Sequence, residues 1–218
     1  MSIYDTLNPM QKEAVLQTEG PLLILAGAGS GKTRVLTHRV VYLIEEKGIN
    51  PWNIMAITFT NKAAGELKER LEAMLGPDGQ DIWASTFHST CARILRRDGE
   101  SIGYTSHFTI YDTDDSKRVM KECQRLLNID DKMLSHKTLL HEISHAKDSL
   151  ISPEDYLNDA GDDVRLRKIG EAYRLYEKLL RDADAMDFDD MIVNTVKLLE
   201  ENEEKWGETD CLRLTVDT

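Results

Sequence analysis

The sequence predicts an α/β protein whose first half holds a mainly parallel sheet and whose second half is helical. Up to about residue 108, short apolar runs alternate with amphipathic stretches of about 10–15 residues, which is typical of βαβ units. From about Asp112 onward the strand signals stop and helical spacing continues. The 218 residues, 41% hydrophobic and 30% charged, are enough to bury a substantial core and exclude a wholly disordered chain.

Strands and helices alternate in the first half. The expected order is strand 22–25, helix 32–46, strand 54–59, helix 62–75, strand 82–85 and helix 88–97. The run at 22–25 (Leu-Leu-Ile-Leu) is continuous and apolar, so we expect a buried strand there. In the first helix Val35, Leu36 and Val40 recur at helical spacing, and the second helix is stopped by Gly76 and Pro77.

The second half carries helical spacing with Asp or Ser near several starts. The expected helices are 114–127, 137–146, 164–183 and 189–199. We therefore expect a core domain at residues 1–108, a helical subdomain at 109–199, and an acidic, divergent or truncated segment at 200–218.

Charge is divided unevenly along the chain. Residues 1–108 carry 11 basic and 12 acidic side chains (net −1), and residues 109–218 carry 16 and 27 (net −11), which gives the total of −12. Bulk attraction to nucleic acid is excluded, so a DNA contact must come from local groups. With no export signal, no membrane span and no Cys-x-x-Cys among Cys91, Cys123 and Cys211, we expect a cytoplasmic protein with reduced thiols and no structural metal.

A glycine-rich string connects the first expected strand to the first expected helix. It reads Ala26, Gly27, Ala28, Gly29, Ser30, Gly31, Lys32 and Thr33. Glycines let backbone N–H groups point inward, and the helix N-terminus adds its positive dipole end. The string predicts a Walker A loop for Mg·ATP, with Lys32 reaching the β- and γ-phosphates and the Thr33 hydroxyl coordinating Mg²⁺. The alternative is a strand–helix turn without a ligand, and Ala26 stands where the pattern has glycine.

Five ordered segments resemble UvrD/Rep/PcrA-like superfamily 1 DNA helicases. They are residues 7–11, 26–34, 56–64, 85–89 and 186–190, and the similarity spans about residues 3–199. The resemblance implies a partial RecA-like P-loop NTPase core, running from about residue 5 to the C-terminus, with an all-helical inserted subdomain. It further implies that Gln11 contacts the adenine edge through its amide and that Arg34 lies beside the adenine, where a guanidinium can stack.

The resemblance also implies a single-stranded DNA site where two strands end. Phe59 would offer a stacking face to a base, and Thr60 and Asn61 would cap a helix and hold a phosphate. Phe87 and His88 repeat this arrangement after the third strand. Without the resemblance, we would favour the interpretation of both phenylalanines as core aromatics and of Asn61 as an ordinary cap.

Two other patterns suggest metal chemistry. His141, Glu142 and His145 form a His-Glu-x-x-His string on an expected helix, but a zinc hydrolase needs a third ligand that the sequence does not supply convincingly. Residues 187, 189 and 190 are aspartates that can form a carboxylate group for a metal. We favour instead a cap on the last helix by Asp187 or Asp189, with Phe188 packed inward.

The similarity ends near residue 199. The family continues into a strand ending Asp-Glu-x-x-Asp, whose Glu orients the attacking water, and into a second RecA-like domain that supplies an arginine finger. In this sequence Asp217 can match the first acidic position, and Thr218 then replaces the Glu. We therefore expect the ATP-binding portion of a 3′-to-5′ ATP-dependent DNA helicase and translocase, inactive alone because it is truncated. The alternative is a catalytically dead nucleotide- or DNA-binding module.

Overall fold

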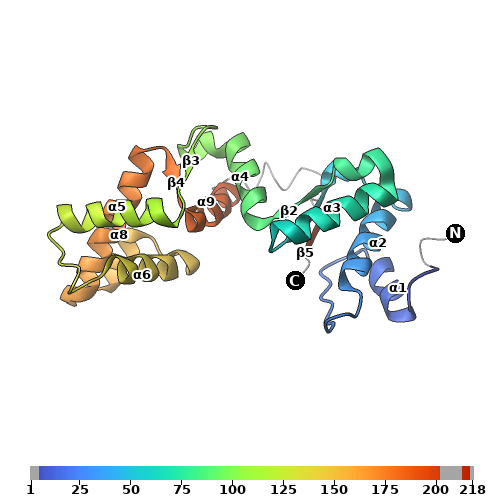
Figure 1. Ribbon diagram of the computed structural model, residues 1–218, viewed down its shortest axis with the longest axis horizontal. Coiled ribbons are helices and arrows are strands. Elements are labelled where there is room, and N and C mark those ends of the chain that lie inside the picture. The colour runs from blue at the N-terminus through green and yellow to red at the C-terminus, as the bar shows by residue number, and fades with distance from the viewer. Residues whose placement is uncertain (1–4, 202–212, 217–218) are drawn as a thin grey trace. The chain divides into compact units, whose positions relative to one another are not determined.

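The computed structural model describes residues 5–201 and the backbone of residues 213–216. The chain divides into two compact units (Figure 1). Unit 1 comprises residues 1–90 and 204–218, and unit 2 comprises residues 91–203. The division falls within helix α4 (Phe87–Asp98). The glycine-rich loop therefore belongs to unit 1, and the His-Glu-x-x-His string belongs to unit 2.

Unit 1 is built on a parallel sheet whose described strands follow the order β2-β1-β5. Its elements are α1 (Pro9–Leu16), α2 (Lys32–Glu45), β1 (Ile54–Thr58), α3 (Asn61–Leu75), β2 (Trp83–Thr86) and β5 (Arg213–Val216). Thr58 lies opposite Thr86, and Ala56 lies opposite Thr215. The parallel α/β architecture predicted for the first half is confirmed. Asp217, the candidate acidic residue, lies just outside the described residues.

The strand predicted at residues 22–25 is wrong. These residues form no regular secondary structure, and Leu23 and Leu25 are 82% and 87% exposed. A parallel strand is buried only when neighbours pair with its edges and helices cover its faces. In the described part of the sheet, no strand pairs with this segment. An apolar composition alone therefore does not decide whether a segment forms a buried strand, because neighbouring strands and helices must cover it.

The core of unit 1 lies between the sheet and helices α2 and α3. Helical spacing places the apolar side chains of both helices on one face, and these side chains meet the fully buried strand β1. The buried cluster consists of Leu36, Val40, Leu43, Ile54, Ala56, Leu67, Leu71 and Ile82. This packing fixes the start of α2, where the glycine-rich loop ends.

Unit 2 is mainly helical. Its elements after α4 are β3 (Thr109–Ile110), α5 (Thr113–Leu126), α6 (His136–Asp148), α7 (Pro153–Asp159), α8 (Val164–Asp182), β4 (Ala185–Met186) and α9 (Phe188–Glu201). Side chains of α5, α6 and α8 form its largest buried cluster, with Met120, Leu139, Ile143, Tyr176 and Leu180 among its members. The four predicted helices are confirmed, and the structure adds α7 and the strands β3 and β4.

The expectation of an all-helical second part is therefore wrong in one detail. Strands β3 and β4 form a short parallel pair in which Thr109 lies opposite Ala185 and Ile110 lies opposite Met186. Two-residue strands are too short to produce an alternating hydrophobic pattern, so no periodicity could reveal them. The pair joins the segment that enters the helices to the segment that leaves them.

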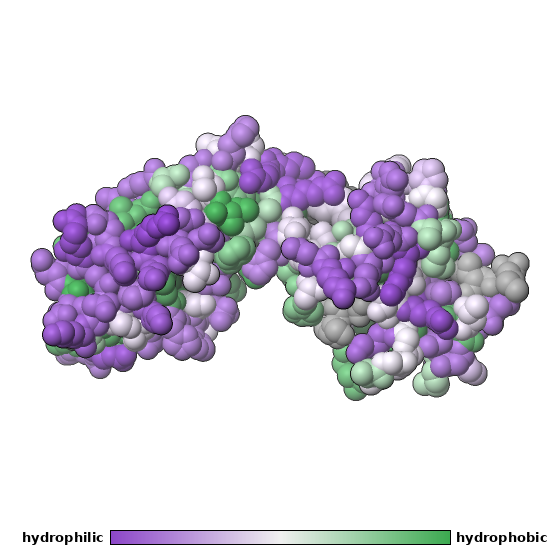
Figure 2. Space-filling model, in the orientation of Figure 1, coloured by the Kyte–Doolittle hydropathy of each residue, from purple (hydrophilic) through white to green (hydrophobic). Residues whose placement is uncertain are grey.

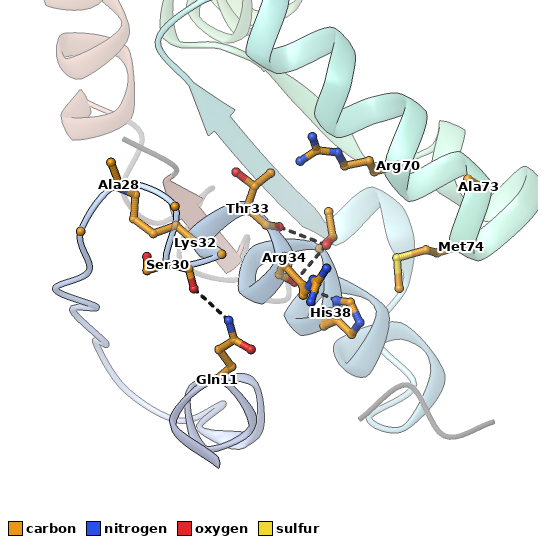
Figure 3. A pocket seen from close by; sticks show the side chains of 14 residues that line it. Gln11, Ala28, Ser30, Lys32, Thr33, Arg34, His38, Arg70, Ala73 and Met74 are labelled. Carbon is orange, nitrogen blue, oxygen red and sulfur yellow. Dashed lines mark hydrogen bonds between the residues drawn. The ribbon is translucent and has the colours of Figure 1, made fainter. Parts of the chain in front are cut away.

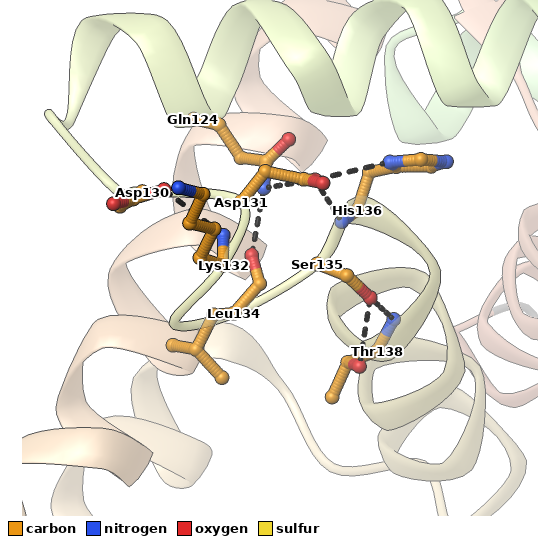
Figure 4. A network of polar contacts seen from close by, with 8 residues as sticks. All are labelled: Gln124, Asp130, Asp131, Lys132, Leu134, Ser135, His136 and Thr138. Carbon is orange, nitrogen blue, oxygen red and sulfur yellow. Dashed lines mark hydrogen bonds and ion pairs between the residues drawn. The ribbon is translucent and has the colours of Figure 1, made fainter.

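The loop between α5 and α6 is held by a polar network (Figure 4). The buried amide of Gln124 donates to the Leu134 carbonyl at 2.7 Å and to the Asp131 carboxylate at 3.2 Å. Asp131 also accepts hydrogen bonds from the backbone N–H and Nδ1 of His136. These donors, Gln124 foremost, lower the pKa of Asp131. The network fixes the start of α6, where Ser135 is the N-cap.

The surface of unit 2 agrees with its acidic sequence. The face visible over α5 and α6 is mainly hydrophilic (Figure 2). In the described part of the chain, no helix combines the length and apolar character needed to cross a membrane.

Candidate functional site

The glycine-rich loop borders a pocket of about 820 Å³ at the N-terminus of α2 (Figure 3). Gly29 and Gly31 have φ values of +75° and +86°, which residues with a Cβ rarely adopt. Gly31 is the N-cap of α2, and no side chain caps this helix. The loop and the first turn of α2 therefore present backbone N–H groups and a positive dipole end to the pocket, a combination that suits phosphate oxygens.

Lys32 and Thr33 occupy the first turn of α2 and both line this pocket. The Lys32 ammonium donates to the carbonyl of Ala26 within the same loop, at 3.3 Å. A long hydrogen bond to a neutral carbonyl is weaker than a charge-assisted bond to a phosphate oxygen, so a triphosphate can replace it. The residues present thus fit a nucleotide: Lys32 as the counter-charge, Thr33 as a hydroxyl ligand for Mg²⁺, and the loop N–H groups as the cradle.

Gln11 already bonds with both ends of its amide. Its Oε1 accepts from the backbone N–H of Asn8 at 3.0 Å, which completes a capping box at the start of α1. Its Nε2 donates to the carbonyl of Ser30 at 2.9 Å, which ties α1 to the glycine-rich loop. A primary amide has two N–H donors and two acceptor lone pairs, so one of each is left for an adenine edge. The sequence did not predict the link to Ser30.

The pocket has a second wall that sequence reasoning missed. Arg70, Ala73 and Met74 of α3 line it across from Arg34 and His38 of α2 (Figure 3). These α3 residues are about 40 positions away in sequence, so only the packing of α3 against α2 brings them to the loop. His38 had a local signal, because it follows Arg34 by one helical turn. Its Nδ1 lies 2.8 Å from the Arg34 carbonyl oxygen.

Two phenylalanines meet where β1 and β2 end. Thr58 and Thr86 are opposite each other in the parallel register, so Phe59 and Phe87 emerge at the same edge of the sheet. Their ring centroids are 5.6 Å apart and the rings are tilted by 50°. Phe59 is 65% exposed, so the interpretation of it as a core aromatic is wrong. Phe87 is half-buried. The exposed ring supplies a flat apolar face beside polar groups.

These polar groups stand at two helix N-termini. The Thr60 hydroxyl accepts from the N–H of Ala63 at 3.1 Å and caps α3, as predicted. Thr86 acts in the same way at α4, accepting from the N–H of Ser89 at 3.3 Å. The expected cap by Asn61 is wrong, because Asn61 is the first residue within α3 and is exposed, and Thr60 alone is the N-cap. The structure therefore brings Phe59, Thr60, Asn61, Phe87 and His88 to one end of the sheet, at the start of two adjacent helices.

The sequence matches the family described as UvrD/REP helicase N-terminal domain over residues 7–210. The chain belongs to this family. Similar proteins include the ATP-dependent DNA helicase PcrA of Bacillus subtilis (52% identical over 197 residues) and that of Staphylococcus epidermidis (49% over 199 residues). These matches cover 89% and 91% of the chain and 26% and 27% of the relatives. The PcrA of Staphylococcus aureus is 47% identical over 199 residues. The chain thus spans about a quarter of the length of these helicases.

Unit 2 of this UvrD/REP family chain buries a cluster of charged groups. The Lys147 ammonium of α6 is 2% exposed and lies 2.8 Å from Glu177, 3.0 Å from Asp187 and 2.6 Å from Asp190. The Tyr176 hydroxyl donates to Asp187 at 3.0 Å. Sequence reasoning missed Lys147, although its spacing of four residues from Ile143 places it on the buried face of α6. Three carboxylates around one buried ammonium form an internal ion cluster.

The aspartates of this cluster cap a helix. Asp190 donates its N–H to the Asp187 carboxylate at 2.8 Å, and Asp187 donates its N–H to the Asp190 carboxylate at 3.2 Å. This reciprocal pair starts α9, so the cap predicted at Asp187 is confirmed. Phe188, predicted to pack inward, is 46% exposed. The reason is that the inward positions of this turn are taken by the two carboxylates and their lysine.

Burial and charge act against each other in this cluster. Burial raises the pKa of Asp190 to about 8, against the opposing effect of Lys147, and burial likewise raises the pKa of Glu177. Burial lowers the pKa of Lys147, but the three carboxylates more than offset this and raise it well above its usual value. One ammonium faces three carboxylates, and the neighbouring carboxylates therefore also raise the pKa of Asp190 and Glu177. The Lys147 ammonium occupies the position between the three carboxylates.

The His-Glu-x-x-His string lies on α6, as predicted. The rings of His141 and His145 are 4.7 Å apart between centroids, and Glu142 lies 3.7 Å from Arg165. Across the described residues, no group of three or more metal-ligating side chains forms. The third ligand that a hydrolytic zinc centre needs is therefore not found in this part of the chain, and the zinc hydrolase alternative is unsupported.

Proposed function

We propose that this chain is the nucleotide-binding part of an ATP-dependent DNA helicase that translocates 3′ to 5′ along single-stranded DNA. The observation that carries the proposal is the pocket at the start of α2, where the Gly29 and Gly31 turns, Lys32 and Thr33 meet. Membership in the UvrD/REP family supports ATP as the nucleotide, and the PcrA helicases are relatives over this same segment.

Each residue of the pocket has a proposed task. Bound Mg·ATP supplies the phosphoryl group whose transfer drives movement. Lys32 exchanges its bond to Ala26 for the β- and γ-phosphates, and the Thr33 hydroxyl holds Mg²⁺. Residues 27–31 cradle the phosphates through their N–H groups. Gln11 reads the adenine edge with its remaining donor and lone pair, and Arg34 stacks beside the base.

The exposed edge of the sheet is the proposed DNA site. Phe59 and Phe87 offer stacking faces, and the N-termini of α3 and α4 face the same edge with Thr60, Asn61 and His88 nearby. Stacking on an aromatic ring tolerates any base, which suits a protein that moves along a strand of arbitrary sequence. The near-neutral charge of residues 1–108 makes few phosphate contacts available, so binding should be weak and salt-sensitive.

Nucleotide binding tests the proposal most directly. We expect Lys32→Ala to weaken binding of a fluorescent ATP analogue in Mg²⁺ by at least about tenfold, because the ammonium is the main side-chain counter-charge. Lys68→Ala, on the exposed surface of α3, is the matched control and should leave affinity unchanged. Equal affinities for all three proteins would reject the pocket as the nucleotide site.

We also propose that a polypeptide of these 218 residues binds ATP without appreciable turnover. Phosphoryl transfer depends on positioning and charge stabilisation, and the sequence contains neither the water-orienting Glu nor a second RecA-like domain with its arginine finger, which is typically worth about 10³–10⁵ in rate. DNA-stimulated hydrolysis that Lys32→Ala abolishes would contradict this.

Polarity needs a longer protein. When the segment is extended through the acidic strand and second domain, we expect it to unwind a duplex carrying a 3′ single-stranded tail. Preference for a 5′ tail would reverse the assignment. Loss of unwinding after Lys32→Ala would show that unwinding depends on the nucleotide pocket.

A further inference from the structure

Two imidazoles stand side by side on the surface of unit 2. His141 and His145 are one turn apart on α6, both are exposed, and their rings meet edge to face at 82° with centroids 4.7 Å apart. Within the described residues, neither ring makes a hydrogen bond or an ion pair. The proposed helicase function does not use them, and they belong to a different unit from the nucleotide pocket.

Imidazoles at this spacing can bind one metal ion together. Residues i and i+4 of a helix share a face, so both rings can turn toward a common point without moving the backbone. Imidazole nitrogen suits late divalent metals, whose affinity for such a site follows the order Ni²⁺ < Cu²⁺ > Zn²⁺. Mg²⁺ prefers oxygen ligands and keeps its waters, so the ion that accompanies ATP would not occupy this position.

The acidic surroundings of His141 and His145 attract cations, but within the described residues they supply no third protein ligand. Residues 109–218 carry a net charge of −11, which raises the local concentration of cations. His141, but not His145, lines a hollow of about 340 Å³ together with Ser144 and Asp189, and both rings are otherwise exposed, so water can reach an ion held between them. Charged residues on the same helix include Lys137, one turn before His141, and Asp148, three residues after His145; Glu142 pairs with Arg165 of α8. Lys147 is directed into the ion cluster and is neutralised there.

We propose that His141 and His145 bind one late divalent transition metal ion, Cu²⁺ most tightly, with water completing its coordination. The site is open and exchangeable. It is not a hydrolytic centre, because Glu142 is engaged by Arg165 and the described residues supply two protein ligands only. Because the ion binds folded α6 and not the unfolded chain in this geometry, it stabilises unit 2 by mass action.

The test is a titration of the 218-residue chain, freed of metal by chelation, with CuCl₂, NiCl₂, ZnCl₂ and MgCl₂ separately. We expect Cu²⁺ to bind tightest at the imidazole pair, Mg²⁺ not to bind there, and the electron paramagnetic resonance spectrum of bound Cu²⁺ to show two coordinated nitrogens. His141→Ala and His145→Ala should each weaken this binding at least tenfold. His107→Ala, which removes another exposed imidazole of unit 2, should not.

A control variant distinguishes chelation by the two rings together from binding that depends only on the number of histidines. The double variant His145→Ala with Asp148→His keeps the number of imidazoles but separates them by seven residues, about 10 Å along the helix. It should bind no more tightly than His145→Ala alone. Wild-type affinity in this variant, or in His141→Ala with His145→Ala, would overturn the proposal. Far-ultraviolet circular dichroism identifies any variant that has lost α6. Where an alanine variant has lost the helix, the same histidine is replaced by glutamine instead.

Discussion

The two units differ in how far they bury and pair their charged and apolar side chains. In unit 1, Lys32 makes one long hydrogen bond to a loop carbonyl and Leu23 is 82% exposed. In unit 2, Lys147 is 2% exposed and three carboxylates surround it within 3.0 Å. Lys32, for which we propose phosphate binding, is partly exposed and has one weak partner in its own loop. Lys147 is enclosed and paired with carboxylates.

The apolar cores of the two units also differ in how completely they are buried. Unit 2 closes its largest apolar cluster with side chains from α5, α6, α8 and the loop that follows α5. Unit 1 packs α2 and α3 against β1 but leaves the apolar segment before the glycine-rich loop exposed. The proposed nucleotide site therefore lies in the unit that leaves more apolar surface exposed in its described residues.

The largest expected effect is on the ion cluster. Lys147→Met leaves three buried carboxylates without their cation and should lower the free energy of unfolding by about 3–5 kcal/mol. Chemical denaturation followed by circular dichroism measures this. Lys197→Met removes a lysine whose ion pair with Glu201 is about half exposed and should change stability by less than about 0.5 kcal/mol. Similar losses for both would erase the contrast between enclosed and surface lysines.

The aromatic pair of unit 1 provides the next test. Phe59→Ala should weaken binding of a single-stranded oligonucleotide by about 1–3 kcal/mol, because an exposed ring offers a stacking face. Its folding stability should change little, since 65% of the residue is already exposed. Affinity measured by fluorescence anisotropy at several salt concentrations should fall with log[salt] at a slope of about −0.7 per neutralised phosphate. Unchanged DNA affinity would move the DNA site elsewhere.

The ion cluster also predicts that stability depends on pH. Burial raises the pKa of Asp190 to about 8, whereas an unfolded aspartate titrates near about 3.9. Between these values the folded state holds a proton that the unfolded state has lost, so this group's contribution to stability falls as pH rises. The stability of the Asp190→Asn variant relative to wild type should therefore increase between pH 5 and 8, by at most about 1.4 kcal/mol per pH unit.

The matched control for this pH effect is Asp182→Asn, at an exposed position in the last turn of α8. Urea unfolding of all three proteins at pH 5, 6, 7 and 8 supplies the comparison. A stability difference between Asp190→Asn and wild type that does not vary with pH would show that Asp190 is ionised throughout.

The smallest expected effect concerns the exposed leucines. Leu23→Ser should change stability by less than about 0.5 kcal/mol, because the side chain is already in water. Leu139→Ala, in the centre of the unit 2 cluster, should cost about 2–5 kcal/mol. A large loss from Leu23→Ser would mean that residues 22–25 are buried in solution.

Sequence reasoning succeeded where the information was local. Helices α2, α3, α5 and α8 were predicted because apolar side chains recur at their spacing and punctuating residues mark their ends. It failed at residues 22–25. An apolar run can form a buried strand only if other strands pair with it and helices cover it, and the run itself does not show whether they do. It also failed at Phe188, because the cap and the internal ion cluster compete for the same inward positions.

The candidate site follows the same rule. The glycine-rich loop is contiguous, so its residues and their proposed roles were visible in the sequence. Arg70 and Met74 reach the pocket only through the packing of α3 against α2, and no spacing within either helix points to that contact. Phe59 and Phe87 were identified through the family resemblance, whereas their contact follows from the parallel register of β1 and β2, which places both rings at one edge of the sheet.

The short pairing of β3 with β4 brings the two ends of a helical segment together. Thr109 lies opposite Ala185, so the chain leaves and returns within about one strand spacing, roughly 4.8 Å. The backbone N–H and hydroxyl of Thr105 donate to the carboxylate of Asp184, which fastens the same junction. The segment between the two strands is nevertheless joined to the chain that follows β4, because Lys147 of α6 pairs with Asp187 and Asp190. A replacement of this segment would therefore have to supply a cation at the position of Lys147.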